Sequence, residues 1–386
     1  MARAELSLEN LLDSMTAAGE LDEKHADGSL TCYACGHRCL IKPGRRGICK
    51  VRFNHHGELR VPWGYVGALQ CDPTEKKPFF HVYPGSDTLT FGMLGCDMHC
   101  PYCQNWVTSQ ALRDPASAQA GAWPQAVTPQ QLVGLAQRQG ARLVGSSYNE
   151  PLITSEWAVS VFREAAAAGL KCAFVSNGNA TREVLEYIRP YVSAYKIDLK
   201  TMSDRNYRRL GAVLEHVLDG IRMVHALGFW LEIVTLVIPG FNDSTQELTD
   251  AARFLASLSP DIPWHVTAFH QDYHMTEPDD TTAAGLIRAA EIGQEAGLRY
   301  VYAGNLPGQV GEYEHTFCPS CHTRLIQRYG YVILDYRLTA EGACPKCGTR
   351  LAGIWTDRPE QVRRHGPGAP RSVRSVINRY RSDLAR

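Results

Sequence analysis

The sequence lacks the features that would place the protein at a membrane or on a nucleic acid. No hydrophobic run approaches the ~20 residues that a membrane-spanning helix needs. A secretory pattern is absent from the first residues, because Glu5, Glu9 and Asp13 interrupt them. An excess of one charge is also missing, since 40 basic residues face 40 acidic ones. We therefore expect a cytoplasmic protein with no membrane partner and no nucleic-acid partner.

Cysteine, in contrast, is abundant, with 13 residues in a chain of 386. Disulfides are rare in a reducing compartment, so clustered cysteines there are more typical of metal sites. Cys172 stands alone in a strand-like run and is expected to be a buried free thiol, and we assign no role to Cys71. The other cysteines form three clusters, which are Cys32, Cys35, Cys39 and Cys49; Cys96, Cys100 and Cys103; and Cys318, Cys321, Cys344 and Cys347.

The middle cluster has the pattern expected of a reacting iron–sulfur centre. Cys96, Cys100 and Cys103 follow one another closely, and the next cysteine along the chain is Cys172. Thiolates are the usual protein ligands of iron–sulfur clusters. A [4Fe–4S] cluster held by three thiolates keeps one iron open, and an open coordination position distinguishes a reacting metal centre from a structural one. The pattern therefore predicts a catalytic cluster.

Alternating β-prone and helical segments predict parallel β/α units between about residues 88 and 304. The expected strands are residues 89–95, 142–146, 171–176, 194–199, 231–238, 264–269 and 299–302. The helices expected between them are residues 129–138, 155–168, 182–191, 205–227, 245–258 and 281–295. Glycines stand where several of these helices should end. The pattern indicates a barrel-like α/β fold.

Polar or glycine-rich segments follow every expected strand. They are residues 95–96, 147–151, 176–179, 198–200, 239–243, 270–272 and 304–305. Asn, Asp and Gly also favour ordinary turns, so one such segment alone would indicate little. In β/α barrels, however, the active site is assembled at the carboxyl ends of the strands. Seven polar strand ends, the first of which carries three cysteines, therefore predict a site at this end of the barrel.

Several motifs in this order resemble a known family. Cys96-x3-Cys100-x2-Cys103 followed by Gln104-Asn105 resembles the motif of the radical S-adenosylmethionine (SAM) superfamily, in the version used by relatives of pyruvate formate-lyase activating enzymes. The chain resembles the radical SAM enzyme of the AmmeMemoRadiSam system more closely still. The matching segments are Cys35-x3-Cys39-Leu40-Ile41, Gly47-Ile48-Cys49-Lys50-Val51-Arg52, Glu75-Lys76-Lys77-Pro78 and Tyr148-Asn149-Glu150-Pro151. The resemblance runs from about residue 30 to residue 356.

This resemblance implies an α/β fold built on a partial (β/α)6 TIM-like barrel over residues 86–310. A cysteine-rich segment, residues 1–85, would precede the barrel. A zinc-ribbon-like module, residues 311–357, and a basic tail, residues 358–386, would follow it. A tail of this composition is ordinarily solvated or docked on a partner.

The resemblance also implies roles for the matching residues. Cys96, Cys100 and Cys103 would hold the [4Fe–4S] cluster, and the amino and carboxylate groups of SAM would bind its fourth iron. The residues implied to contact SAM are Tyr102 near the adenine, Asn149 and Glu150 at the amino group, and Ser176, Asn177, Asp198 and Lys200 at the ribose or the methionine carboxylate. A carboxylate suits an ammonium group, and a lysine suits a carboxylate. A solvated loop residue is the ordinary alternative for Lys200.

The implied activity is reductive cleavage of SAM to methionine and a 5′-deoxyadenosyl radical, which removes hydrogen from an unidentified small molecule or protein. An activase that installs a glycyl radical on another enzyme is one alternative, and a metal-binding scaffold without SAM chemistry is another. The implied partners are a flavodoxin-like or ferredoxin-like electron donor and the Memo-type and AMMECR-type proteins of the same system.

The two outer cysteine clusters are expected to be structural or auxiliary. Cys318-x2-Cys321 and Cys344-x2-Cys347 have the spacing of a four-cysteine zinc ribbon, and a rubredoxin-type iron site is the alternative. The N-terminal four, Cys32, Cys35, Cys39 and Cys49, would suit structural zinc or an auxiliary iron–sulfur cluster, and we favour zinc.

Two histidines straddle the sixth expected strand. His265 lies within it and is expected to be a satisfied core residue. His270 stands at its end, where strand ends build the site, and is the better candidate for the pocket.

Overall fold

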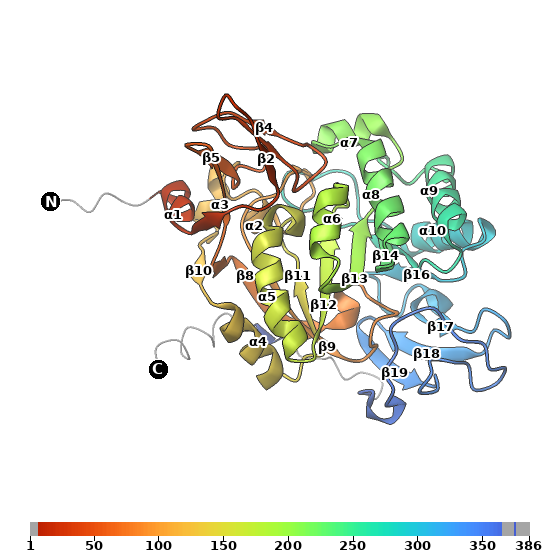
Figure 1. Ribbon diagram of the computed structural model, residues 1–386. Helices are drawn as coiled ribbons and strands as arrows, with labels where there is room; N and C mark the ends of the chain where they lie inside the picture. Colours follow the sequence, from red (N-terminus) through yellow and green to blue (C-terminus); the bar gives the residue numbers. More distant parts are fainter. Residues whose placement is uncertain (1–6, 365–373, 376–386) are drawn as a thin grey trace.

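The computed structural model describes residues 7–364 and 374–375 (Figure 1). Most of the predicted basic tail, residues 358–386, lies outside this range. Among the described residues, no helix has the length and apolar character required to cross a membrane.

A nine-stranded sheet forms the centre of the molecule, in the order β16-β15-β14-β13-β12-β11-β9-β8-β20. Seven consecutive strands of this sheet, from β16 to β9, are parallel. They are β9 (Asp87–Gly92), β11 (Leu143–Ser146), β12 (Lys171–Ser176), β13 (Val192–Asp198), β14 (Trp230–Val237), β15 (Trp264–Ala268) and β16 (Val301–Gly304). Antiparallel β8 (Ala68–Pro73) and β20 (Arg374–Ser375) extend the edge beside β9. The predicted parallel α/β fold is therefore confirmed.

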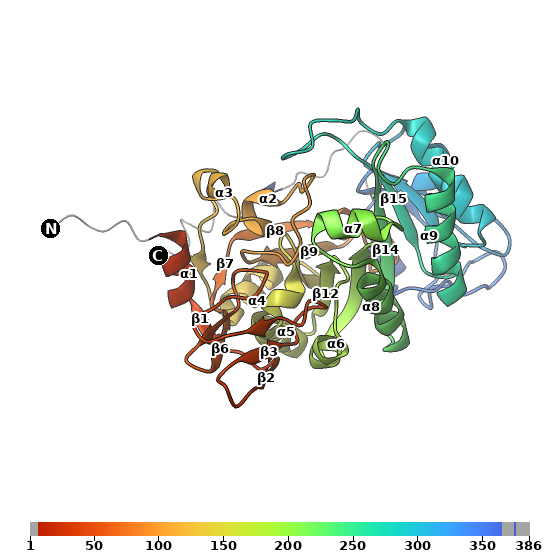
Figure 2. The ribbon, with the colours of Figure 1, turned by 90° about the horizontal axis from the view of Figure 1, so that it is seen from above.

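Helices connect the parallel strands and lie along the outer face of the curved sheet (Figures 1 and 2). They are α4 (Pro129–Arg138), α5 (Ser155–Ala167), α6 (Arg182–Ile188), α7 (Asp204–Leu210), α8 (Leu214–Ala226), α9 (Thr245–Leu258) and α10 (Ala283–Glu295). Short helices α2 (Trp106–Ser109) and α3 (Pro115–Gln119) follow the cysteine loop after β9. Side-chain caps begin most of the long helices; Thr128 forms a capping box with Gln131 at α4, for example.

The single helix expected over residues 205–227 is instead two helices, α7 and α8. The chain breaks at Gly211, whose φ of +89° is left-handed and ends α7. A Cβ atom at Gly211 would also lie 2.5 Å from the His99 ring, so glycine is required there for packing as well. The periodicity of the apolar residues continues across the break, which is why it predicted one helix.

The N-terminal segment forms two small antiparallel sheets beside α5 and α6 (Figures 1 and 2). One contains β1 (Thr16–Ala18), β6 (Glu58–Pro62) and β5 (Phe53–His55), and the other β2 (Asp22–Lys24), β3 (Leu30–Cys32) and β4 (Leu40–Ile41). α1 (Leu8–Ser14) precedes both sheets, and β7 (Tyr65–Val66), which follows them, pairs with β10 (Gln125–Ala126). Their apolar side chains, among them Leu30, Ile41 and Val61, belong to the main hydrophobic core.

The C-terminal module is a three-stranded antiparallel sheet with a core of its own. Its strands are β17 (Thr316–Phe317), β18 (Arg324–Tyr329) and β19 (Val332–Tyr336). Leu325, Ile326 and Ile333 form this core together with Tyr302 of β16 and Phe80 from the β8–β9 connection. Buried Arg328 donates a hydrogen bond of 2.9 Å to the Phe80 carbonyl. The module therefore packs against the β16 side of the sheet.

Candidate functional site

A cavity of about 390 Å³ lies at the carboxyl end of the parallel strands. Cavities of ~300–1,000 Å³ are typical of small-molecule sites. All of the residues that the sequence assigns to the iron–sulfur cluster and to SAM line it, namely Cys96, Cys100, Tyr102, Cys103, Asn149, Glu150, Ser176, Asn177, Asp198 and Lys200. They come from the carboxyl ends of β12 and β13 and from the segments that follow β9, β11, β12 and β13, which the parallel sheet brings to one edge.

The three cysteines lie in a loop that starts at Gly95, where φ is +98°. A Cβ atom at Gly95 would lie 2.8 Å from the Val51 side chain and 3.2 Å from the Cys49 carbonyl oxygen, so only glycine fits. The backbone N–H of Met98 points to the Cys96 sulfur at 3.4 Å. Cys100 is buried, and burial raises the pKa of its thiol to about 11.

The donor set of this loop fits a [4Fe–4S] cluster with one open iron. Among the described lining residues of the cavity, cysteine sulfur comes only from Cys96, Cys100 and Cys103. Metal coordination keeps thiols deprotonated even where burial would otherwise protonate them. Three such ligands leave one iron of a four-iron cluster without a protein thiolate, and the cavity offers room on that side.

A buried carboxylate forms one wall of the cavity. Glu150 is 2% exposed and accepts hydrogen bonds from the Ser176 hydroxyl and the Asn177 backbone N–H, both at 2.7 Å. Burial, and then the nearby charge of Asp97, raise the pKa of Glu150 to about 8. A cation in the cavity would oppose both effects, so this wall suits an ammonium group.

The adjacent wall carries positive charge. The Asp198 carboxylate lies between two ammonium groups, with Lys196 Nζ at 2.6 Å and Lys200 Nζ at 3.7 Å. Burial opposes ionisation of Asp198, but the two lysines hold its pKa below its ordinary value. Two cations against one anion leave an excess positive charge beside the cavity, which suits a carboxylate of a ligand.

An aromatic pair stands near these walls. Tyr102, between the second and third cysteines, is buried and packs edge-on against Phe241, with ring centroids 5.9 Å apart. Phe241 comes from the loop after β14, which the Asn242 side chain anchors through the Ile238 backbone N–H at 2.7 Å. Tyr102 lines the cavity and offers its ring to a ring-containing ligand, and Phe241 packs edge-on against it.

The other half of the cavity was not predicted from the sequence. Lys77 is buried and donates to Asp72 at 3.0 Å and to the Tyr148 hydroxyl at 2.8 Å. Tyr148 itself has a φ of +66°, an uncommon conformation that clusters at functional sites. Tyr331, from the turn between β18 and β19, brings the C-terminal module into the cavity wall. Glu75-Lys76-Lys77-Pro78 served only as a family marker, although its paired lysines were a signal for this half.

His265 is a satisfied buried residue, as expected, although it also lines the cavity, whereas the expectation that His270 belongs to the pocket is wrong. His265 lines the cavity, where its Nε2 lies 2.7 Å from the buried Glu232 carboxylate. His270 does not line it; its side chain is exposed and lies 2.9 Å from the Gln104 amide. The strand β15 ends at Ala268, two residues before His270, so His270 is already beyond the rim.

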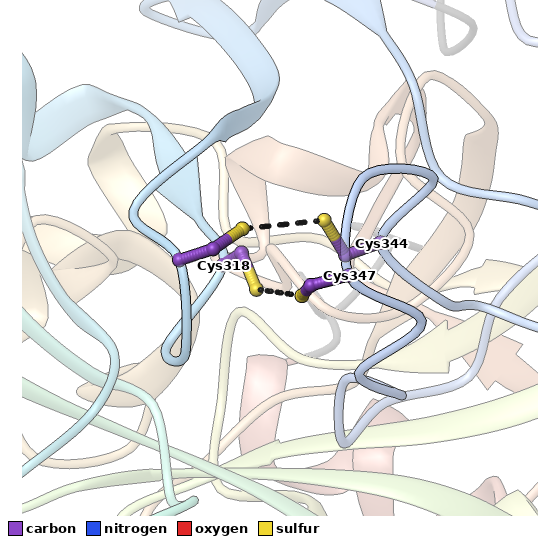
Figure 3. A group of neighbouring side chains, drawn as sticks. Cys318, Cys344 and Cys347 are labelled. Carbon is purple, nitrogen blue, oxygen red and sulfur yellow. Dashed lines mark hydrogen bonds between the residues drawn. The ribbon is translucent and has the colours of Figure 1, made fainter.

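The four C-terminal cysteines converge as the spacing predicts. The four sulfurs lie within 4.8 Å of one another, with Cys318–Cys347 at 3.4 Å and Cys321–Cys344 at 3.7 Å (Figure 3). Four thiolates around one tetrahedral zinc would be about 3.8 Å apart, from a Zn–S bond of about 2.3 Å. Within the part of the chain that the structure describes, this is the one group of three or more possible ligands that converges so closely. The N-terminal cysteines, Cys32, Cys35, Cys39 and Cys49, do not.

Comparison with known proteins places these features in a family context. A family model described as the radical SAM superfamily matches residues 91–254, which begin in β9 and include the three-cysteine loop. The "Uncharacterized protein MJ0808" of Methanocaldococcus jannaschii is 34% identical over 332 residues, which cover 85% of this chain and 97% of that protein. An isethionate sulfite-lyase activating enzyme of Desulfovibrio desulfuricans is 29% identical over 144 residues, which cover 36% of this chain and less than half, 46%, of that enzyme.

Solved structures with related folds cover parts of the chain. A domain of pyruvate-formate lyase-activating enzyme from Bacteroides vulgatus is 24% identical, with a TM-score of 0.38, over 42% of this chain and 98% of that one. SuiB of Streptococcus suis is 14% identical, with a TM-score of 0.45, over 62% of this chain and 54% of that one.

Proposed function

We propose that the chain, which belongs to the radical SAM superfamily, is an enzyme that cleaves SAM reductively at a [4Fe–4S] cluster held by Cys96, Cys100 and Cys103. When bound, the cluster and SAM supply a carbon-centred radical that removes a hydrogen atom from a substrate. We further propose membership of the AmmeMemoRadiSam subfamily, which the motifs over residues 35–52, 75–78 and 148–151 support.

The observation that carries the proposal is the charge pattern around the cavity. Glu150 offers a buried carboxylate on one wall, and Lys200 belongs to an excess of positive charge on the next. SAM carries an ammonium group and a carboxylate on the same carbon, so its methionine end matches this pair of walls. Both walls lie beside the three-cysteine loop, where the open iron position is required.

The chain's own residues would position SAM and keep it from water. Glu150 would accept the ammonium group, and Ser176 and the Asn177 backbone N–H hold that carboxylate in place. Lys200 would bind the carboxylate as a fixed cation. Tyr102 and Phe241 would cover the adenine ring. The deep position of these groups limits competing proton and hydrogen donors, which a radical reaction requires.

The remaining half of the cavity would bind the substrate. Lys76, Lys77, Tyr148, His265 and Tyr331 line it with ammonium, hydroxyl and imidazole groups. Lys76 and Lys77 both pair with the Asp72 carboxylate, at 3.2 and 3.0 Å, and Glu75 lines the same cavity, so this half offers groups of both charges to a polar substrate. The Memo-type and AMMECR-type proteins are proposed partners because they belong with the subfamily that the motifs indicate.

A glycyl-radical activase is the second candidate function. The similarity to isethionate sulfite-lyase activating enzymes favours it. An activase must reach a glycine in a folded partner, so its substrate would be a protein segment inserted into the same cavity. Formation of a glycyl radical in a partner enzyme, seen by electron paramagnetic resonance (EPR), would identify this activity.

The proposed function is tested by product analysis under anaerobic conditions. The protein is reconstituted with iron and sulfide, reduced with dithionite and incubated with SAM, and 5′-deoxyadenosine is measured by mass spectrometry. We expect product from the wild type and from the control Cys172→Ala, whose buried thiol lies away from the cavity, and none from Cys100→Ala. Glu150→Gln should weaken SAM binding about 10- to 100-fold, as expected for a lost charged hydrogen bond. An intact cluster that yields no 5′-deoxyadenosine would refute the proposal.

A further inference from the structure

The four N-terminal cysteines gather around the turn that ends at Arg52. The backbone N–H of Cys32 donates to the carbonyl of Cys39 at 2.9 Å, which brings the first and third cysteines together. The backbone N–H of Ile48 lies 3.4 Å from the Cys39 sulfur, so the turn that carries Cys49 adjoins it. The backbone N–H of Gly47 donates to the carbonyl of Arg52 at 2.9 Å, and the Arg52 Nε lies 3.2 Å from the Cys32 sulfur, so the turn that carries Cys49 also adjoins Cys32.

The described structure does not gather these four sulfurs as tightly as the four C-terminal sulfurs. Among the described residues, no three of them lie within 4.8 Å of one another, whereas all four C-terminal sulfurs do. A single zinc draws its four thiolates to about 3.8 Å from one another. A four-iron cluster holds its thiolates farther apart, because each one binds a different iron.

The surroundings of the sulfurs also suit an iron–sulfur cluster. The Arg52 Nε donates to the Cys32 sulfur at 3.2 Å, and the backbone N–H of Ile48 points to that of Cys39. Hydrogen bonds to the sulfurs tune the potential of such clusters. Arg52 and Glu156 are each 1% exposed and paired through both guanidinium nitrogens, at 2.7 and 2.8 Å. Because its charge is paired with Glu156, Arg52 brings no uncompensated positive charge into the buried surroundings of Cys32.

The N-terminal cysteines adjoin the loop of the first cluster through two glycines. The backbone N–H of Gly36 donates to the Asn179 carbonyl at 2.8 Å, and a Cβ atom on Gly36 would lie only 2.2 Å from Asn179 Oδ1. On the other side, Gly95 leaves room for the Cys49 carbonyl. A side chain at Gly95 would push Cys49 away from the three-cysteine loop, and a side chain at Gly36 would push its segment away from Asn179, which follows β12.

A direct side-chain contact also joins the two groups. His37, two residues after Cys35, lies 3.9 Å from the carboxylate of Asp97, the residue that follows Cys96. Asn179 holds the same carboxylate at 2.8 Å. The segment that carries Cys35 therefore contacts the loop that carries Cys96.

We propose that Cys32, Cys35, Cys39 and Cys49 hold a second [4Fe–4S] cluster that delivers electrons to the cluster at Cys96, Cys100 and Cys103. A one-electron carrier protein of the ferredoxin or flavodoxin class reduces the second cluster and is itself oxidised. The second cluster then passes this electron to the first cluster, which is reduced, and returns to its own oxidised state. Leu40 and Ile48, which adjoin Cys39 and Cys49, are 62% and 40% exposed, so this side of the site is open to a carrier.

The existence of the second cluster does not depend on the proposed function, whereas its role as a donor does. Iron, sulfide and zinc are therefore counted in anaerobically reconstituted full-length variants, together with EPR spectra after reduction. Cys96→Ala/Cys100→Ala/Cys103→Ala should keep about four irons per chain and an EPR signal, against about eight irons in the wild type. Removing the N-terminal four by Cys→Ser should also leave about four, and Cys71→Ala is the matched control that should keep about eight.

The donor role is read from the rate of 5′-deoxyadenosine formation in the N-terminal variant. Dithionite reaches the first cluster directly, so product should still form with it, whereas the rate with a carrier protein should fall at least tenfold. If the four-cysteine variant fails to fold, Cys39→Ser alone should alter the EPR signal of the second cluster in the background that lacks the first. Two zinc ions and about four irons per wild-type chain, or a triple variant without iron, would overturn the second cluster. A second cluster without any 5′-deoxyadenosine would refute the proposed function instead.

Discussion

The two outer cysteine groups have the same number of thiols and differ in almost everything else. At the C-terminus, two Cys-x2-Cys pairs bring four sulfurs to within 4.8 Å of one another, as one tetrahedral ion requires. At the N-terminus, the four thiols of Cys-x2-Cys-x3-Cys-x9-Cys form no such close group among the described residues, and Cys49 adjoins the three-cysteine loop at Gly95. The number of thiols therefore predicts a metal site, whereas the separation and position of the ligands indicate what the metal does.

The two cysteine groups also differ in how far the stability of the surrounding structure depends on bound metal. The N-terminal sheets contribute Leu30, Ile41 and Val61 to the main core. The C-terminal module depends on a small separate core around Leu325 and Ile333. Small modules of this kind rely on a metal for much of their stability. Removal of metal should therefore unfold the C-terminal module and leave the N-terminal segment folded.

The largest effect is expected from Cys344→Ser, which removes a buried ligand of the C-terminal site. Metal binding to small four-ligand sites is linked to on the order of 10 kcal/mol of folding free energy. The module should lose protection from hydrogen exchange over residues 316–356, while β9 to β15 keep theirs. Cys39→Ser is the counterpart at the N-terminus and should change bound iron without such unfolding. Equal loss of hydrogen-exchange protection in the two variants would contradict this difference between the C-terminal and N-terminal sites.

Arg52→Met should give the next largest effect, because it leaves the Glu156 carboxylate buried without its partner. Breaking a buried pair in this way costs about 3–5 kcal/mol. The loss should appear in urea unfolding of the protein and be largely restored in Arg52→Met/Glu156→Leu, where both charges are gone. A double variant as unstable as the single one would show that packing, rather than charge, holds the N-terminal segment on α5.

Acid should loosen the C-terminal module through His81. Its Nδ1 donates to the Ala352 carbonyl at 2.7 Å, and its Nε2 accepts from the Tyr302 hydroxyl at 2.6 Å, so the buried ring is neutral. Burial lowers the pKa of His81 to about 4. The unfolded state then binds more protons, so stability is full above about pH 6.5 and falls by about 3 kcal/mol as the pH drops to about 4.

The measurement is limited proteolysis of the module between pH 7 and pH 4.5, with His81→Asn as the comparison. Asparagine cannot take up a proton in this range, so the variant should be weaker at pH 7 but should show less pH dependence. Unchanged acid sensitivity in the variant would assign the effect to another group.

Cys172→Ala should have the smallest effect. The thiol is fully buried, its sulfur lies 3.8 Å from the Phe162 carbonyl oxygen, and it forms no disulfide in the described structure. Loss of one buried sulfur should cost about 1 kcal/mol in thermal unfolding. The iron and zinc contents should stay unchanged. A lower metal content in the variant would show that Cys172 belongs to a metal site.

The strands and the three-cysteine loop were predictable because their signals are local. Apolar runs give the strands, and parallel order then gathers the segments after β9, β11, β12 and β13 at one edge. The break at Gly211 was missed because the apolar period continues through it. Tyr331 could not be assigned to the cavity, because its position depends on how the C-terminal module packs against β16. Likewise, thiol spacing alone favoured zinc over an iron–sulfur cluster at Cys32, Cys35, Cys39 and Cys49, whereas the arrangement of the sulfurs leads us to propose the cluster.

The most direct test of the open iron at Cys96, Cys100 and Cys103 is a Mössbauer spectrum of ⁵⁷Fe-reconstituted protein, with and without SAM. The N-terminal four-cysteine variant gives the cleanest sample, because only the first cluster remains in it. We predict that SAM changes the signal of one iron of the four and leaves the other three in place. If saturating SAM leaves the signals of all four irons of an intact cluster unchanged, the claim that SAM binds an open iron at Cys96, Cys100 and Cys103 is contradicted.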